Sequence, residues 1–274
     1  MKDIIKLKND FKDYEFSIVV LTSVVNPKVD FKDVPQDERL HKKDLTQMLW
    51  NDTIPGILKN SIDEKFELII VDNGSCEEHK TIIRNISSIH QPTRLVFNNE
   101  NFGVAPGWNS GLKLCRGEYI CIVSDDYILN THNFLRILQA PMLIDNEVVI
   151  TGPETAQLGS DGMSRQLWRL PYVDYSAVNC CMFRHSFLKK VGYLDENFWP
   201  YMAEDADIGW LANSYKYKVM KVDLQNSTHW GSSSVYRYWT NEEIDEIWKT
   251  NREYLIKKHE KYLKEREQID ERYK

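Results

Sequence analysis

Residues 118–130 constrain the fold of this chain more than any other stretch. Residues 119–123 form an unbroken apolar run of β-branched, aromatic and cysteine side chains. The run is too short for an ordinary helix and predicts a buried strand. It ends in Ser124, Asp125 and Asp126, and carboxylates at the end of a buried strand need a positive partner. One interpretation is a divalent cation held by the carboxylates and by substrate phosphates. The other is a turn that caps the next helix.

Strands and helices alternate through the first half of the chain. The patterns predict strands at 16–21, 67–71, 94–97 and 119–123, with helices at 77–88 and 103–114. This order is typical of an α/β fold with a Rossmann-like, mostly parallel sheet and helices on both faces. Ligands of such sheets bind beyond the carboxyl ends of the strands. The polar residues at those ends are Thr22, Ser23, Asp72, Asn73, Asp125 and Asp126.

The usual phosphate-binding fingerprints are absent from the sequence. Neither G-x-G-x-x-G after the first strand nor G-x-x-x-x-G-K occurs. The helix at 103–114 instead carries a row of glycines, which permits close approach of a backbone or a ligand. Pro106 is expected to shorten or kink this helix.

The second half of the chain has a different pattern. It predicts strands at 148–151, 177–183 and 216–222, helices at 185–191 and 204–214, and a loop or hairpin at 154–177. In helix 204–214 we expect Asp205 to share a face with apolar residues, and Asp207 to be solvated or to favour the helix dipole. Thr240 and Glu243 predict a capping box that opens a charged C-terminal helix. A further helix is expected within 42–50.

Charge and cysteine content limit the class of protein. The formal net charge of -6 argues against a general nucleic-acid surface. The five cysteines include no CxxC pair, which favours reduced thiols over a disulfide framework or a zinc site. No signal peptide and no transmembrane segment is predicted. We expect a cytoplasmic protein, with peripheral membrane attachment through the C-terminal helix left open.

Several motifs occur together in the order of a known family. They are 17–22 (Ser-Ile-Val-Val-Leu-Thr), 67–75 (Glu-Leu-Ile-Ile-Val-Asp-Asn-Gly-Ser), 101–103 with 107–111, 116–119 leading to 124–126, 191–196 before 204–207, and the segment at His229. Together they resemble the GT-A glycosyltransferases, specifically the large family 2 of inverting enzymes. A rhamnosyltransferase-like subgroup is left open. The resemblance spans roughly 16–234.

The resemblance implies a reaction and a set of site residues. A hexosyltransferase-type enzyme (EC 2.4) would move a sugar from a nucleoside-diphosphate sugar to a hydroxyl of a glycan or other acceptor, with inversion and with Mn²⁺ or Mg²⁺. The metal ligand would be Asp126, joined by His229, which could instead contact the diphosphate. The general base would be Asp205, with Glu204 as a second catalytic candidate. The nucleotide-sugar site would comprise Thr22, Ser23, Asp72, Asn73, Asn101, Gly103, Asn109 and Asp125.

Within that site the resemblance gives two acidic residues separate roles. Asp72 would accept a hydrogen bond from the nucleobase, and Asp125 would lie near the ribose. The alternatives are that His229 is a loop residue without a ligand, and that Glu204 and Asp205 only cap a helix. Ser124 departs from the family, which often has an acidic or amide residue there, and 26–65 is longer than usual. Candidates to stack on sugars, with core packing as the alternative, are Trp168, Trp199, Tyr201 and Trp230.

The resemblance also implies an organisation of the chain. Residues 1–15 would be an extension, 16–238 the GT-A domain and 239–274 a charged helix, with a nucleotide-binding half at 16–126 and an acceptor half at 127–238. Two rival functions remain. A sugar nucleotidyltransferase predicts a glycine-rich basic loop after the first strand, which 22–27 is not. A non-catalytic carbohydrate- or partner-binding module predicts loss of Asp126 or Asp205, and both are present.

Overall fold

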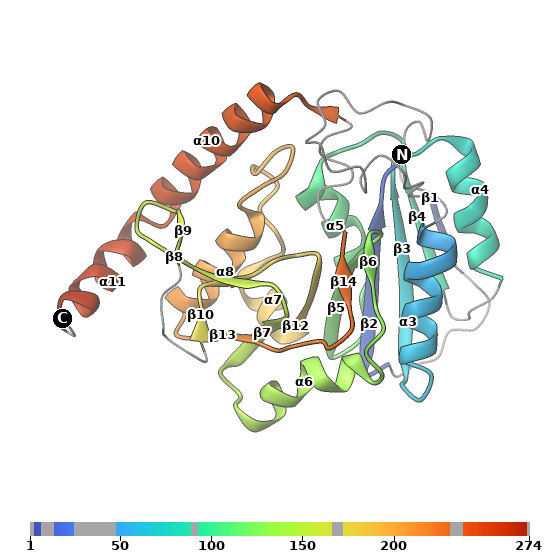
Figure 1. The fold of residues 1–274 in the computed structure, drawn as a ribbon, viewed down its shortest axis with the longest axis horizontal. Helices are drawn as coiled ribbons and strands as arrows, with labels where there is room; N and C mark the ends of the chain where they lie inside the picture. The colour runs from blue at the N-terminus through green and yellow to red at the C-terminus, as the bar shows by residue number, and fades with distance from the viewer. Residues whose placement is uncertain are drawn as a thin grey trace.

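The computed structural model describes residues 3–6, 14–24, 48–88, 93–165, 172–230 and 238–272. Within them, one mixed sheet of nine strands runs through the molecule, with helices on both faces (Figure 1). In spatial order the strands are β1 (Asp3–Lys6), β4 (Thr93–Asn98), β3 (Phe66–Asn73), β2 (Phe16–Thr22), β5 (Tyr119–Ser124), β12 (Cys180–Arg184), β7 (Val148–Gly152), β13 (Lys218–Lys221) and β10 (Tyr172–Val173).

The helices and the short strands complete the described chain. The helical elements are the π-helical turn η1 (Leu49–Thr53), α3 (Ile54–Asn60), α4 (Glu77–Ile86), α5 (Val104–Leu112), α6 (Phe134–Ile144), α7 (His185–Val191), α8 (Glu204–Ser214), α10 (Asn241–Lys258) and α11 (Glu260–Arg272). Two small sheets contain β8 (Thr155–Leu158), β9 (Ser164–Arg165) and β11 (Tyr175–Ser176), and β6 (Tyr127–Ile128) with β14 (Thr228–His229).

Four neighbouring strands, β4, β3, β2 and β5, are parallel and form the half of the sheet that the sequence predicts. Their register places Thr22 opposite Asp72, and Leu21 opposite Ser124. The carboxyl ends of β2, β3 and β5 therefore meet at one edge. Beyond β5 the sheet changes character, because β12 runs antiparallel to both β5 and β7.

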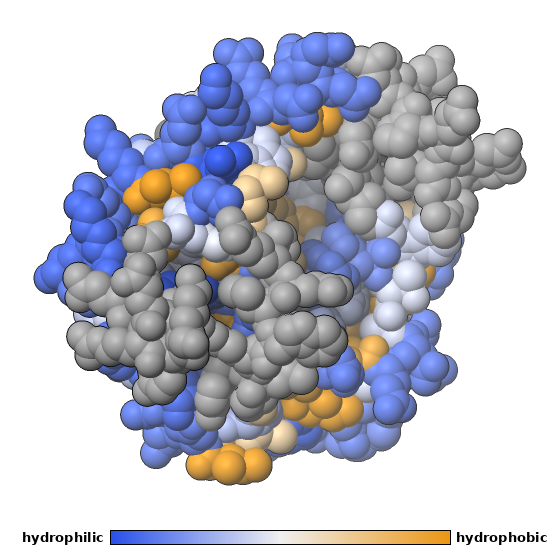
Figure 2. Space-filling model, turned by 60° about the vertical axis from the view of Figure 1, so that its left-hand side comes forward, coloured by the Kyte–Doolittle hydropathy of each residue, from blue (hydrophilic) through white to orange (hydrophobic). Residues whose placement is uncertain are grey.

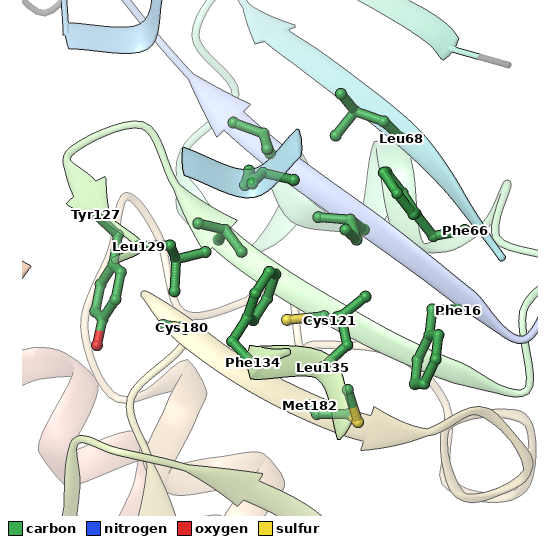
Figure 3. Packing of buried hydrophobic residues seen from close by; sticks show 14 of the residues in the cluster. Phe16, Phe66, Leu68, Cys121, Tyr127, Leu129, Phe134, Leu135, Cys180 and Met182 are labelled. Atoms are coloured by element: carbon green, nitrogen blue, oxygen red, sulfur yellow. The ribbon is translucent and has the colours of Figure 1, made fainter. Parts of the chain in front are cut away.

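The apolar strand runs are buried on both faces of the sheet, as expected for parallel strands between helices. In β5, Cys121 faces a core shared with α3, α4 and α6, whereas Ile122 faces a core shared with α5, α7 and α8. Figure 3 shows Phe134 and Leu135 of α6 packed beside Cys121 in the first core.

The glycine row of α5 allows this helix to lie close to the sheet. A Cβ at Gly111 would sit 2.5 Å from Cγ1 of Val19 and 2.8 Å from Cγ2 of Val71. Pro106 lies in the first turn of α5, where a missing backbone N–H is tolerated. The close approach expected from these glycines is thus against the strands.

The C-terminal helices pack on the body through buried polar contacts. The predicted capping box is present: the Thr240 hydroxyl accepts from the Glu243 N–H, and Glu243 accepts from the Thr240 N–H. The prediction of a solvated Asp207 is wrong, because its side chain is 2% exposed and pairs with Lys258 and His259. Sequence periodicity could not show this, since the partners lie about fifty residues downstream.

Other sequence predictions differ from the structure in detail. Helix α6 was not expected, and 154–177 contains β8, β9, β10 and β11 around residues outside the described set. Most of the helix expected within 42–50 also lies outside the described residues. None of the described helices is long and apolar enough to cross a membrane. The side of the molecule that carries α10 and α11 comes forward in Figure 2, where the surface is mainly hydrophilic with scattered hydrophobic patches.

The buried carboxylate of Glu67 connects the amino ends of β2, β3 and β4. Glu67, whose side chain is 1% exposed, lies 2.9 Å from Nη1 of Arg94 and 3.4 Å from Nε of Arg116. It also accepts hydrogen bonds from the Ser17 hydroxyl at 2.7 Å and from the Arg116 N–H at 2.6 Å. This cluster ties β2, β3 and β4 together at the edge opposite the polar strand ends.

We expect Glu67→Gln to lower the free energy of unfolding by about 3 kcal/mol, because it leaves the half-buried Arg94 guanidinium without its carboxylate and removes a buried acceptor from Ser17 and Arg116. Urea unfolding followed by circular dichroism measures this change. Glu260→Gln, which removes an exposed carboxylate paired with Lys264, is the matched control and should have little effect. Equal stability of the two variants would contradict a structural role for the Glu67 cluster.

Candidate functional site

A cavity of about 550 Å³ opens beyond the carboxyl ends of β2 and β5. Its walls come from these strand ends, from the turn before α8 with the start of that helix, and from α10. Of the predicted site residues, the cavity is lined by Thr22, Ser23, Asn73, Asn101, Gly103, Asp125, Asp126, Glu204, Asp205 and His229.

Thr22 links the ends of β2 and β5 through its side chain. Its hydroxyl donates to Oδ2 of Asp125 at 2.6 Å and lies 2.8 Å from Nε2 of His79. The parallel register of β2 and β5 brings Thr22 and Asp125 together. His79, on α4, is fully buried and was not singled out from the sequence, since one histidine in a helical pattern carries no signal of its own. This chain of contacts fixes the direction of the Asp125 carboxylate.

Asn73 organises the loop that follows β4. Its amide nitrogen donates to Oδ1 of Asn101 at 2.9 Å and to the Gly103 carbonyl at 3.0 Å. Its amide oxygen accepts from Nδ2 of Asn98 at 3.0 Å and from the Phe102 N–H at 3.2 Å. Gly103 has a φ of +93°, and a Cβ there would lie 2.7 Å from the Pro200 carbonyl oxygen. The predicted amide-and-glycine segment therefore shapes the cavity wall.

Two predicted nucleotide-sugar residues do not line the cavity. Asp72 is fully buried at the end of β3, where its carboxylate accepts from the Ser75 N–H at 3.2 Å. Burial raises the pKa of this carboxyl above its usual range. The Asn109 amide is used elsewhere: it donates to the Leu194 carbonyl and to Glu196, at 2.8 and 2.9 Å. Asn109 therefore binds the segment after α7 and does not line the cavity.

Asp126 and His229 lie side by side at one edge of the cavity. Nε2 of His229 is 3.3 Å from Oδ1 of Asp126, because β14 pairs with β6 directly after the acidic motif. The Ser124 hydroxyl donates to the same Oδ1 at 2.7 Å. The departure at Ser124 therefore supplies a hydrogen bond to the proposed metal ligand.

The other side of the His229 ring faces a residue that sequence reasoning missed. Nδ1 lies 3.3 Å from Oε2 of Glu154 and 2.9 Å from Nδ2 of Asn179. Burial lowers the pKa of His229, but the bonds to Asp126 and Glu154 outweigh burial and raise it to about 10. This edge of the cavity thus favours a positive charge. Glu154 opens the segment 154–177, which the sequence predicts as a loop or hairpin, so no pattern could identify it.

Helix α8 presents two adjacent acids to the cavity. Burial raises the pKa of Asp205 to about 6, and burial followed by the nearby Asp205 charge raises that of Glu204 to about 8. Oε2 of Glu204 is buried and makes no hydrogen bond within the described chain. The Asp205 carboxylate accepts from the Ala206 N–H at 2.7 Å. These acids are poised to exchange protons near neutral pH.

A side chain of α10 hydrogen-bonds to the turn before α8 and holds it in place. Met202 and Ala203 have φ values of +78° and +72°, which non-glycine residues rarely adopt. Nδ2 of Asn251, on α10, donates to the carbonyls of Tyr201 at 2.8 Å and Met202 at 3.2 Å. The contacts from α10 stabilise the strained conformation that aims Glu204 and Asp205 into the cavity.

The aromatic candidates occupy different places. Tyr201 lines the cavity and packs against Trp239, with ring centroids 4.9 Å apart. Trp199 is 61% exposed beside Gly103, and Trp230 packs against a small buried cluster away from the cavity lining. Trp168 lies outside the described residues.

Within the described chain, no group of three or more His, Cys, Asp or Glu side chains forms a complete metal site. As the predicted ligands, Asp126 and His229 would offer one oxygen and one nitrogen. A cation that also binds substrate phosphates needs no more than this from the protein.

Comparison with known proteins places this chain in a family. Residues 51–188 match the family model of "Glycosyl transferase family 2". Two proteins of Haemophilus influenzae (strain ATCC 51907 / DSM 11121 / KW20 / Rd), both described as uncharacterized glycosyltransferases, are similar to the chain. One is 38% identical over 78 residues, covering 27% of this chain and 31% of the relative. The other is 21% identical over 223 residues, covering 73% of this chain and 68% of the relative.

Solved structures show the same fold. The mannosyltransferase PcManGT from Pyrobaculum calidifontis, in complex with GDP-Man and Mn²⁺, aligns with a TM-score of 0.50 and 15% identity over 76% of this chain and 55% of its own. GalNAc-T7 with UDP, GalNAc and Mn²⁺ aligns with a TM-score of 0.57 and 13% identity over 79% of this chain and 43% of its own. The predicted fold class is confirmed, and the chain belongs to glycosyl transferase family 2, with the GT-A fold.

Proposed function

We propose that the protein transfers a hexose from a nucleoside-diphosphate sugar to an acceptor hydroxyl, with inversion at the anomeric carbon. The observation that supports this most is the meeting of two acidic pairs in one cavity. Asp125 and Asp126 come from the end of β5, and Glu204 and Asp205 from the start of α8. The first pair suits a cation and the donor, and the second suits proton transfer.

The donor set at the edge of the cavity fits a divalent metal ion. Asp126 offers a carboxylate and His229 an imidazole nitrogen, a combination that suits Mn²⁺ better than Mg²⁺. Glu154 contacts the opposite nitrogen of His229, as carboxylates behind metal-bound histidines usually do. When bound, the metal would neutralise the diphosphate of the leaving group as a Lewis acid. Both structural neighbours described above contain Mn²⁺.

The donor nucleotide is proposed to lie along the ends of β2 and β3. Asp125, directed by Thr22, would accept hydrogen bonds from the ribose. Asp72 is fully buried and does not line the cavity, so its predicted contact with the nucleobase is left out of this donor site, while Asn73 holds Asn101 and Gly103 in place at the cavity wall. We leave Asn109 out of the donor site because its amide binds Leu194 and Glu196.

Asp205 is proposed as the general base. Its pKa of about 6 leaves it ionised at neutral pH, yet basic enough to accept a proton. The acceptor hydroxyl would give its proton to Asp205 as its oxygen bonds to the anomeric carbon. The bond from that carbon to the phosphate oxygen breaks, and the nucleoside diphosphate leaves with the electron pair. One displacement of this kind inverts the anomeric centre.

A panel of nucleotide sugars tests the donor site. We expect one of UDP-, GDP- or dTDP-sugars to stabilise the wild type only with Mn²⁺ present, by about 2.7 kcal/mol at 100 times its Kd. Asp126→Ala should lose this stabilisation and the metal-dependent hydrolysis of the donor. Thermal unfolding and release of nucleoside diphosphate are the measurements.

Asp223→Ala is the control for this panel, since that side chain is 78% exposed and pairs only with Lys221 among the described ion pairs. It should behave as the wild type. Absence of stabilisation by every nucleotide would overturn the donor site. Sugar binding with no turnover would favour the binding-module alternative.

Replacing the proposed base should separate chemistry from binding. Asp205→Asn should lower kcat about a hundred- to ten-thousand-fold. In the wild type, kcat/KM should fall as the pH drops below about 6, because protonated Asp205 cannot accept a proton. Steady-state rates from pH 5 to 8 measure both effects. A rate that is constant over this range, or an unimpaired variant, would exclude Asp205 as the base.

Glu204→Gln should stabilise the protein more at pH 8 than at pH 5. The folded pKa of Glu204 is about 8 against an ordinary value of 4.5, so between these values the folded state holds a proton that the unfolded state has released. Wild-type stability therefore falls as the pH rises through this window, and glutamine does not titrate. The Tm of the variant relative to wild type should rise by roughly 2–4 °C per kcal/mol.

Thermal unfolding at the two pH values measures the effect, with Glu78→Gln as the control because Glu78 is an exposed glutamate on α4. The Tm of this control should track the wild type at both values. A pH-independent difference between Glu204→Gln and wild type would show that Glu204 is ionised in the folded protein.

A further inference from the structure

One wall of the cavity is not used by the donor and base chemistry above. Ile244, Trp248, Arg252 and Leu255 all line the cavity and follow one another at intervals of three or four residues, so they share one face of α10. This helix lies outside the segment 51–188 that the family model matches. The match to the family model therefore assigns no role to this wall.

Helix α10 is fixed firmly relative to the proposed base. Asn251 binds the turn before α8, as described above. At the end of α10, Lys258 and the following residue His259 contact Asp207 of α8 at 2.8 and 2.7 Å. Because α8 also carries Asp205, the cavity face of α10 is held at a set position relative to the attacking hydroxyl.

The guanidinium of Arg252 is pre-positioned on this wall. It lies over the Trp248 ring, 5.2 Å from the centroid, and its Nε donates to the Asp161 carbonyl at 2.7 Å. Its stem passes over Gly162, where a Cβ would lie 3.1 Å from Cγ of Arg252. Nη1 contacts Sδ of Met163 at 3.4 Å, and Nη2 makes no hydrogen bond within the described chain.

Arg252 has no anionic partner among the described residues, although it is half-buried. Two other half-buried arginines do: Arg94 lies 2.9 Å from Glu67, and Arg266 lies 2.9 Å from Asp174. A third, Arg184, instead donates to the carbonyls of Val148 and Met142. Of the described residues that line the cavity, Arg252 is the only lysine or arginine. A partly desolvated guanidinium beside a cavity gains from a bound anion, which replaces the water it has lost.

We propose that the face of α10 carrying Trp248 and Arg252 binds the acceptor, and that this acceptor is a saccharide bearing a carboxylate or phosphate group. The proposal rests on the proposed function, since it concerns the second substrate of the same transfer. The flat Arg252 fork matches either oxyanion through two parallel hydrogen bonds. The Trp248 ring of the wall offers an apolar surface on which a sugar ring packs.

The position of the wall also separates this anion from the donor. The donor diphosphate belongs with Asp126 and His229, at the end of β5 and on β14. Arg252 belongs to α10 and to the turn between β8 and β9. An acceptor held there by its charged end presents a hydroxyl toward Asp205, whose helix is braced by the same α10.

The test compares matched acceptors on the intact chain with Mn²⁺ and the nucleoside diphosphate bound. The probes are a 4-nitrophenyl hexoside, the corresponding uronide and the corresponding 6-phosphate, with Kd measured by calorimetry. We expect one of the charged probes to bind at least about tenfold more tightly than the neutral one. Arg252→Gln should abolish that preference, and Arg252→Lys should retain part of it. Preference for the uronide identifies a carboxylate, and preference for the 6-phosphate identifies a phosphate.

Lys249→Gln removes the same charge from an exposed position of α10 and should leave the preference intact. Equal binding of neutral and charged probes by the wild type, or a preference that survives Arg252→Gln, overturns the proposal. So does weaker binding of the nucleoside diphosphate in a folded Arg252→Gln, because Arg252 would then hold the donor. If no nucleoside diphosphate binds the wild type, the proposed function itself fails; if it binds but no charged probe does, only the acceptor proposal fails.

Discussion

The parallel pairing of β2 with β3 and β5 is the constraint on which the rest of the structure depends. Strand β2 lies between the other two, and its residues alternate between two cores that are both fully buried. A slip of one residue would exchange the two faces, so the register is fixed by packing. That register alone brings Thr22 beside Asp72 and Asp125. The polar site is thus a consequence of apolar packing in the strands that precede it.

Gathering carboxylates in one cavity has an electrostatic cost, and the proposed ligands of the site would lower it. Asp125, Asp126, Glu204 and Asp205 all line one cavity; the first three are buried and Asp205 is half-buried. Part of the cost is relieved within the protein, by the Thr22 hydroxyl and the His229 ring. The raised pKa values of Glu204 and Asp205 indicate that the remaining cost of burial is not relieved within the protein. The proposed divalent cation at Asp126 and the proposed proton acceptor at Asp205 would be two uses of the same unrelieved charge.

The sequence predicted those parts of the site whose signal is local. The buried runs of β2, β3 and β5, the acids that follow them, helices α7 and α8 and the Thr240 capping box are all visible as short patterns. The resemblance to a family then assigned roles to residues such as Asp126 that the pattern alone left open. The assignment of these roles stays a prediction, as does the division into domains.

Contacts between distant segments could not be predicted in this way. His79 reaches Thr22 from a helix fifty-seven residues away, and Glu154 reaches His229 across seventy-five. Each is one polar residue in an ordinary pattern, and only the tertiary fold gives it a partner. The prediction that Asp207 is solvated was wrong for the same reason. The helical period correctly placed Asp207 on a different face from Asp205, but it could not show that Lys258 and His259 cover that face.

This failure explains how the C-terminal helices contribute to the site. Asp205 and Asp207 are two positions apart on α8, so they point in directions that differ by about 200° around the helix. One faces the cavity and the other is covered by Lys258 and His259. Helix α8 is therefore clamped on the side away from the cavity by the segment that also supplies the cavity wall. The contacts of Lys258 and His259 with Asp207 fix the distance between the proposed base and Arg252. A movement of α10 would therefore shift the positions of the proposed base and of the proposed acceptor wall together.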